Sequence, residues 1–199
     1  MHTHPDERPA RSEPEIFDQL SRRGLEAWID VRAHEPSLAW AASRTRILLV
    51  VTREVEALLA ALDDERAGVL KKLAGLSEAD ARRSTVPSGT NLAGLLQHLT
   101  FVEAKWFEAI VGGRSPSRGL RSMDVDPSVS LKTVRAEYRA ACEASDEIIR
   151  SLGDADAPVI HKGKTRDLRW AILAVIGETA RHAGHADILR EQIDGKTGR

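Results

Sequence analysis

The chain has 199 residues, of which 42% are hydrophobic, and its 29 Lys and Arg residues nearly balance 30 Asp and Glu residues. The length fits one compact domain with additional segments. The charge balance argues against nucleic acid as a partner, because phosphate binding needs a surplus of positive charge. No apolar stretch is long enough to cross a bilayer, and the first residues lack the apolar core of a secretory signal. We therefore expect a cytoplasmic protein without a membrane partner.

Cys142 is the only cysteine, so an intrachain disulfide is excluded. It falls in a helical pattern with Tyr138, Ala141 and Ser145, where a small buried side chain is the expected role. Any thiol chemistry would therefore use a thiol from outside the protein.

Four segments show helical periodicity, in chain order. The first is expected from about Thr52 to Leu73 and is followed by Gly75. The second is expected from about Asn91 to Val111, with Asn91 or the threonine before it as the cap and Gly112 at its end. The apolar stripe of the second segment is Leu92, Leu95, Leu96, Leu99, Val102, Trp106, Phe107 and Ile110.

The third segment is expected from about Leu131 to Leu152, and the fourth from about Leu168 to Ile193. Their expected caps are Ser130 and Asp167, and the glycines that end them are Gly153 and Gly195. The stripe expected to face inward on the fourth segment is Trp170, Leu173, Ala174, Gly177, Ala180, His182, Ile188 and Leu189.

These segments predict an all-α fold, because four amphipathic helices bury their stripes most simply as a four-helix bundle. A long polar link, residues 113–129, joins helices two and three, and residues 157–166 form a candidate hairpin around Lys162-Gly163. The domain is expected to span 52–199. Residues 1–51 are interpreted as an N-terminal appendage, partly disordered, or as a mis-called start.

The last helix carries three side chains that can bind a metal ion, Glu178, His182 and His185. At about 100° per residue, all three project from one face, but Glu178 and His185 are about 10.5 Å apart in rise, which is too far to share one small cation. His182 therefore pairs with Glu178 or with His185. The pair four residues apart is the better chelate, because the two side chains stack with nearly parallel directions.

A third ligand would come from another helix, and His98 beside the stripe of helix two is the best candidate. Two imidazoles and one carboxylate leave coordination positions open, as in working metal sites. The alternative is that these are structural histidines held by hydrogen bonds, which is the commoner role. The HExxH signature of zinc proteases is absent, so nothing indicates a peptidase.

Two stretches, VPSGTNLAGLLQHLTFVEAKWFEAIVGG and DLRWAILAVIGETARHAGHADILREQIDGKTGR, resemble the DinB-like superfamily. More narrowly they resemble its actinobacterial branch of unknown function, sometimes called mini-circle-protein-like. The resemblance covers about Thr52 to Arg199 and implies a DinB-like four-helix bundle with a metal bound by His98, Glu178 and His182. Many members carry a second histidine near the position of Ala174, and its absence puts a fourth protein ligand or a histidine base there in doubt.

The resemblance extends to mycothiol-dependent maleylpyruvate isomerase and to S-transferases that use low-molecular-weight thiols. It implies a metal-dependent enzyme, with zinc as the expected cation and nickel or iron as alternatives, that uses a mycothiol-like thiol for S-transfer to, or isomerisation of, a small electrophile. His185 is the candidate proton shuttle, and Arg181 and Arg190 are candidates for binding an anionic substrate.

Two other classes of function stay open, a non-enzymatic metal-binding or stress-response bundle and a metal-free interaction module. Related bundles often pair through their helices, so a homodimer is compatible with the sequence. Trp106 and Trp170 are expected to belong to the core rather than to a substrate site.

Overall fold

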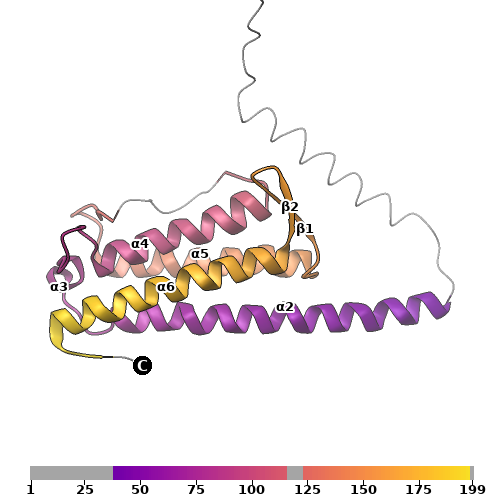
Figure 1. The fold of residues 1–199 in the computed structure, drawn as a ribbon, viewed down its shortest axis with the longest axis horizontal. Helices are drawn as coiled ribbons and strands as arrows, with labels where there is room; N and C mark the ends of the chain where they lie inside the picture. Colours follow the sequence, from indigo (N-terminus) through magenta and orange to yellow (C-terminus); the bar gives the residue numbers. More distant parts are fainter. Residues whose placement is uncertain (1–37, 116–122, 198–199) are drawn as a thin grey trace, which may run out of the picture. The chain divides into compact units, whose positions relative to one another are not determined.

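The computed structural model describes residues 38–115 and 123–197, with side chains from Arg53 onward within those ranges. The chain divides into two compact units, residues 1–44 and 45–199, and the account below concerns the second. Most of the expected N-terminal appendage, up to residue 37, lies outside the described residues. The described part is mostly helical, as the sequence predicts (Figure 1).

Helix α2 spans Leu38–Lys72 and therefore begins well before the start predicted near Thr52. No glycine or proline lies between Pro36 and Thr52, so nothing in the sequence breaks the helix upstream. From Arg53 onward, its buried apolar residues are Val55, Leu59, Leu62 and Val69, and the buried Leu73 follows its last residue.

The predicted second helix is divided into α4, Leu92–Glu103, and the π-helix η1, Ala104–Val111. Asn91 is the cap, and its side-chain oxygen accepts a hydrogen bond from the backbone N–H of Gly94 at 2.8 Å. The sequence predicts one uninterrupted α-helix here, because an i to i+5 pattern leaves no separate signal in an apolar stripe.

Helices α5, Leu131–Leu152, and α6, Leu168–Asp194, have the predicted caps. The side chains of Ser130 and Asp167 accept hydrogen bonds from the third residue after each. Both helices end at glycines in the left-handed region, Gly153 at φ 64 and Gly195 at φ 74.

The stripe predicted to face inward on α6 is partly wrong, because Leu173 is 51% exposed and Ile188 is 56% exposed. From Trp170 to Gly177, α6 carries no charged side chain on any face, so periodicity there cannot distinguish the buried face. The buried residues of α6 are Leu168, Ala171, Ile172, Val175, Thr179, Ala186, Leu189 and Arg190.

Between α5 and α6 lies the hairpin that the sequence predicts. Strands β1, Pro158–His161, and β2, Lys164–Asp167, pair antiparallel. The turn residues Lys162 and Gly163 both have positive φ, 49 and 72, as a two-residue hairpin turn requires. The short helix α3, Glu78–Arg82, is not predicted.

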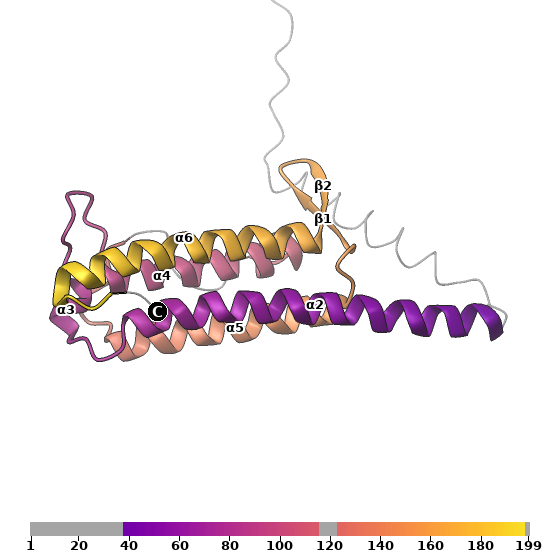
Figure 2. The same cartoon turned by 60° about the horizontal axis from the view of Figure 1, so that its bottom comes forward.

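Within residues 45–199, Figure 2 shows α6 beside α4 and α2 beside α5. Helix α4 contacts both α5 and α6. One apolar cluster lies toward the hairpin and includes Leu59, Phe107 and Ile172, and another lies toward α3 and includes Leu73 and Leu96. None of the described helices is long and apolar enough to cross a membrane.

Buried polar side chains interrupt the core between these two clusters. Arg66 of α2 donates from Nε and Nη2 to both carboxylate oxygens of Glu103 in α4, each at 2.8 Å, and from Nη1 to Asp146 of α5 at 2.8 Å. Arg66 and Glu103 are 4% and 1% exposed. Because a buried charge is tolerated only when it is paired, these contacts fix how α2, α4 and α5 align along their axes.

Candidate functional site

Two histidines from separate helices meet between α4 and α6. The rings of His98 and His182 have centroids 5.0 Å apart and an interplanar angle of 71°. Nδ1 of His98 is buried and has no hydrogen-bond partner among the described residues. Because buried polar atoms are nearly always partnered, an orphaned imidazole nitrogen at this point indicates a site for a ligand or an ion.

Glu178 lies one turn before His182 on α6. Its Oε2 is 3.7 Å from Nε2 of His182 and accepts a hydrogen bond from Nη1 of Arg181 at 2.8 Å. The Glu178 side chain is 36% exposed and that of His182 is 13% exposed. The carboxylate is therefore at the rim, between the half-buried imidazole and an exposed guanidinium.

The environment of His182 favours the neutral form of its imidazole. Burial lowers the pKa of His182 below its usual range, and the neighbouring His98 lowers it further, whereas the Glu178 carboxylate acts in the opposite direction. A neutral imidazole has a lone pair, which it can give to a metal ion or to a proton.

His185 extends this row of imidazoles toward solvent. Its Nδ1 is 3.5 Å from Nδ1 of His182, with ring centroids 5.5 Å apart, and its side chain is exposed. His182 thus lies between His98 on its buried side and His185 on its exposed side. Such a row connects a buried nitrogen with bulk water through one intermediate ring.

The two arginines predicted to bind substrate lie in different surroundings. Arg181 is 60% exposed and beside Glu178. Arg190 is 5% exposed, and its guanidinium donates to the carbonyl oxygens of Lys72 and Ala74 and to the Asp194 carboxylate. These contacts give Arg190 a structural role at the end of α2, and the function proposed below does not use it.

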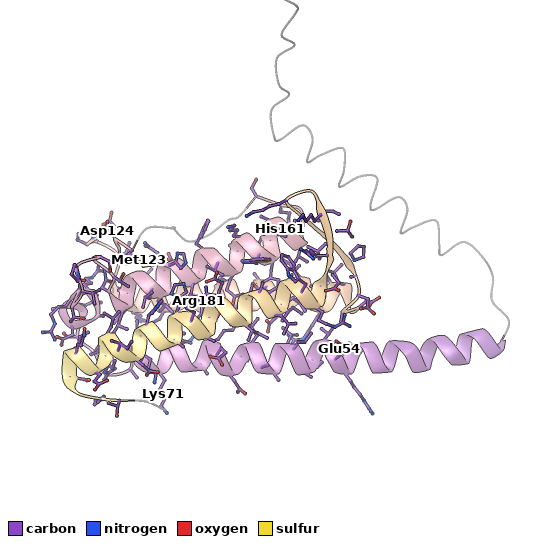
Figure 3. All side chains as sticks on the ribbon, viewed as in Figure 1. Glu54, Lys71, Met123, Asp124, His161 and Arg181 are labelled. Carbon is purple, nitrogen blue, oxygen red and sulfur yellow. The ribbon has the colours of Figure 1, made fainter. Side chains whose placement is uncertain are left out.

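The polar link between η1 and α5 crosses α4 one turn from His98. A Cβ on Gly94 would lie 2.1 Å from the carbonyl oxygen of Met123, so only glycine permits this approach. The Asn91 amide donates to the same oxygen at 3.2 Å, and the Gln97 amide donates to the Asp124 oxygen at 3.1 Å. Figure 3 shows Met123 and Asp124 beside the first turns of α4. The sequence contained one signal of this contact, a glycine inside an apolar helix.

The residues fit a divalent cation in their chemistry. Two imidazoles and a carboxylate form a donor set for zinc and related ions, and Nδ1 of His98 has no hydrogen-bond partner among the described residues. As the described side chains stand, no three His, Cys, Asp or Glu groups are arranged to hold a metal. Binding would therefore require rotation of the half-buried side chains.

Comparison with known families gives one match. The family model described as Mycothiol-S-transferase matches residues 57–195, which is more than half of the chain and contains His98, Glu178 and His182. Comparison with curated proteins gives no match. The match agrees with the predicted resemblance to a DinB-like branch related to mycothiol. The chain therefore belongs to the mycothiol-S-transferase family.

Proposed function

We propose that this protein is an enzyme that joins the sulfur of a mycothiol-like thiol to a small electrophile. The proposed enzyme is a DinB-like four-helix bundle formed by α2, α4 with η1, α5 and α6, and its site lies between α4 and α6. The family match supports the thiol and the transfer. The observation that carries the proposal is the pair of facing imidazoles, His98 and His182, with an unpartnered buried nitrogen on His98.

We propose that His98, Glu178 and His182 hold a divalent cation, with zinc as the expected ion and nickel or iron as alternatives that accept the same ligands. When bound, such an ion lowers the pKa of a coordinated thiol, so that the reactive thiolate exists near neutral pH. The neutral state of His182 favours this role, because a protonated imidazole cannot be a ligand.

The protein has no suitable nucleophilic thiol of its own. Burial, followed by the nearby Glu103 carboxylate, raises the pKa of the Cys142 thiol well above its usual range. Its Sγ is 3.9 Å from Oε1 of Glu103. A thiol with so high a pKa remains protonated and unreactive at neutral pH, which supports a thiol brought from outside.

The residues around the imidazole pair have distinct proposed roles. His185, exposed and beside His182, accepts the thiol proton and releases it to water. The sulfur then forms a bond to the electrophilic carbon, and the electron pair of the broken bond departs with the leaving group. In an isomerisation, the sulfur adds and is later eliminated, so the thiol is recovered. Arg181 orients an anionic electrophile by its charge.

We also propose a cytoplasmic location, because small thiols are kept reduced there. Association into a homodimer through the helices stays a prediction.

The test measures bound metal and thiol consumption on the same preparations, purified without a histidine tag. We expect His98→Ala, Glu178→Gln and His182→Ala to lose most of the metal, and His185→Ala to retain it. With mycothiol and an α-haloketone, His98→Ala should consume thiol at least about tenfold to a hundredfold more slowly than the natural chain, since even outer ligand partners have effects of that size. His34→Ala, upstream of the matched segment, is the matched control.

Two outcomes would contradict the proposal. Metal bound to the natural chain without thiol loss across a broad set of electrophiles would favour a non-enzymatic metal-binding bundle. Retention of metal in Glu178→Gln with loss in His185→Ala would replace the carboxylate with the third imidazole as the ligand.

A further inference from the structure

An aromatic cluster lies where η1, β1 and the start of α6 meet. Its members are Trp106, His161 and Trp170. The rings of Trp106 and His161 stack at 5.3 Å and 22°, those of Trp106 and Trp170 meet at 5.3 Å and 60°, and those of His161 and Trp170 lie 5.4 Å apart. Three elements that are separate in the sequence therefore form one aromatic surface.

The side chains of the aromatic cluster are only partly buried in the fold. All three side chains are half-buried, although Trp106 packs on one side against the core. Within the described residues, neither indole N–H nor the His161 ring makes a hydrogen bond, and none of these nitrogens is sealed from solvent. The cluster thus presents partly exposed rings together with accessible N–H donors.

Three basic side chains lie near the aromatic cluster. Arg166 lies over Trp170, with its Cζ 5.3 Å from the ring centroid. Arg166, Lys105 and Lys162 are all exposed, and none forms an ion pair with a carboxylate in the described part of the chain. In a chain of net charge -1, this is a local excess of positive charge.

The pKa of His161 is affected by the same excess of positive charge. Burial lowers the pKa of His161 below its usual range, and Lys162, Lys105 and Arg166 lower it further, with no carboxylate acting against them. Positive charge that disfavours a protonated imidazole will favour a bound anion at the same place.

The aromatic cluster and the facing imidazoles share the same two helical elements. Trp106 follows His98 on α4 and η1, and Trp170 precedes His182 on α6. From position 98 to position 106 the rise along a helix is roughly 12 Å. In Figure 3, His161 lies near the hairpin end of this surface and Arg181 lies near the middle of α6.

We propose that the aromatic cluster binds a planar anionic group, an aromatic ring that bears a carboxylate, and that this group belongs to the electrophile. Ring faces supply stacking, and Arg166, Lys105 and Lys162 supply charge. A neutral ring would gain nothing from the charges of Arg166, Lys105 and Lys162, and this favours a ring that bears a carboxylate. The assignment to the electrophile rests on the proposed function, whereas binding itself does not.

Titration calorimetry of the full chain, without thiol and without added metal, tests the binding. The probes are 2-naphthoate, the neutral 2-naphthamide, and the non-aromatic cyclohexanecarboxylate. We expect 2-naphthoate to bind at least tenfold more tightly than either of the others. Arg166→Gln should weaken its binding about twofold to fivefold, as for the loss of an exposed ion pair, and Trp170→Leu should weaken it further. Lys132→Gln, an exposed lysine on α5, should have no effect.

Absence of 2-naphthoate binding, equal binding of the amide, or unchanged binding in Arg166→Gln would each overturn the proposal. Arg166 is exposed, so its replacement keeps the test valid if Trp170→Leu fails to fold.

A second assay separates this proposal from the proposed function. With a benzoate that carries a bromoacetamide group on a flexible chain of roughly 12 Å or more, which spans the rise between the aromatic cluster and the facing imidazoles, the thiolate sulfur would bond to the carbon that loses bromide. We expect Arg166→Gln to raise KM for this acid with kcat nearly unchanged, and to leave KM for 1-chloro-2,4-dinitrobenzene unchanged. Binding of 2-naphthoate without turnover of any electrophile would overturn the transferase and leave the anion site. Turnover without any charge preference would overturn the anion site and leave the transferase.

Discussion

The pKa of His161 depends on the positive charges around it. Burial and the charges of Lys162, Lys105 and Arg166 lower its pKa below the ordinary value of 6.5. An NMR titration of the ring should therefore give a pKa below 6.5, and Lys162→Gln should raise it, because one of the repelling charges is removed. Lys132→Gln on α5 is the control. A pKa above 6.5 in the natural chain would contradict this account of the cluster.

The lowered pKa of His161 also determines how the free energy of unfolding changes with pH. Between the lowered pKa and 6.5 the unfolded chain binds more protons at His161 than the folded chain does. The contribution of this residue to the free energy of unfolding is therefore present above pH 6.5 and is lost as the pH falls through that window.

At the scale of the helix, Gly94 and Gly68 are a matched pair. A Cβ on Gly94 would overlap the Met123 carbonyl, whereas a Cβ on Gly68 in α2 meets nothing within 4 Å. Gly94→Ala should lower the free energy of unfolding by about 1–3 kcal/mol, because the link must move. Gly68→Ala should raise it by about 0.5–1 kcal/mol, because alanine favours the helix. Urea denaturation measures both, and equal effects of the two changes would contradict the close contact.

Most helix boundaries could be predicted because each depends on local chemistry. Ser130, Asp167, Gly153 and Gly195 act through their own side chains or backbone freedom, and the structure has them in these roles. The start of α2 was predicted too late, because the segment upstream of Thr52 shows no clear apolar stripe. The buried face of an all-apolar helix segment, as in α6, depends on its neighbours and is invisible to periodicity.

The candidate site was predictable to the extent that it lies on helices. Spacing placed Glu178 and His182 on one face, and the stripe of the second helix directed His98 toward the same interior. The aromatic cluster was not predictable in this way, and both tryptophans were expected in the core. It depends on how the hairpin places His161 against η1 and α6, which is a tertiary contact.

At the scale of the whole molecule, one compact unit begins at Thr45. The first buried apolar residue in the described part is Val55, and the family match begins at residue 57. A shortened chain that begins at Thr45 should therefore keep its helical circular dichroism, with Tm lowered by no more than about 2–4 °C, the shift for about 1 kcal/mol in a domain of this size.

A chain that begins at Asp63 is the matched comparison. It lacks Val55, Leu59 and Leu62, which are at most 2% exposed, and each such loss from a core costs about 2–5 kcal/mol. We expect this chain to be unfolded. Unfolding of the chain that begins at Thr45 would instead show that earlier residues belong to the domain.

His98 and His182 become neighbours only when α4 and α6 are assembled. A molecule that needs both rings at once therefore binds the native chain much more tightly than the denatured one. By mass action, such a molecule at 100 times its dissociation constant would add about 2.7 kcal/mol to the free energy of unfolding. A melting curve recorded at rising concentrations is thus an affinity measurement, and candidate thiols or cations can be ranked before any reaction is known.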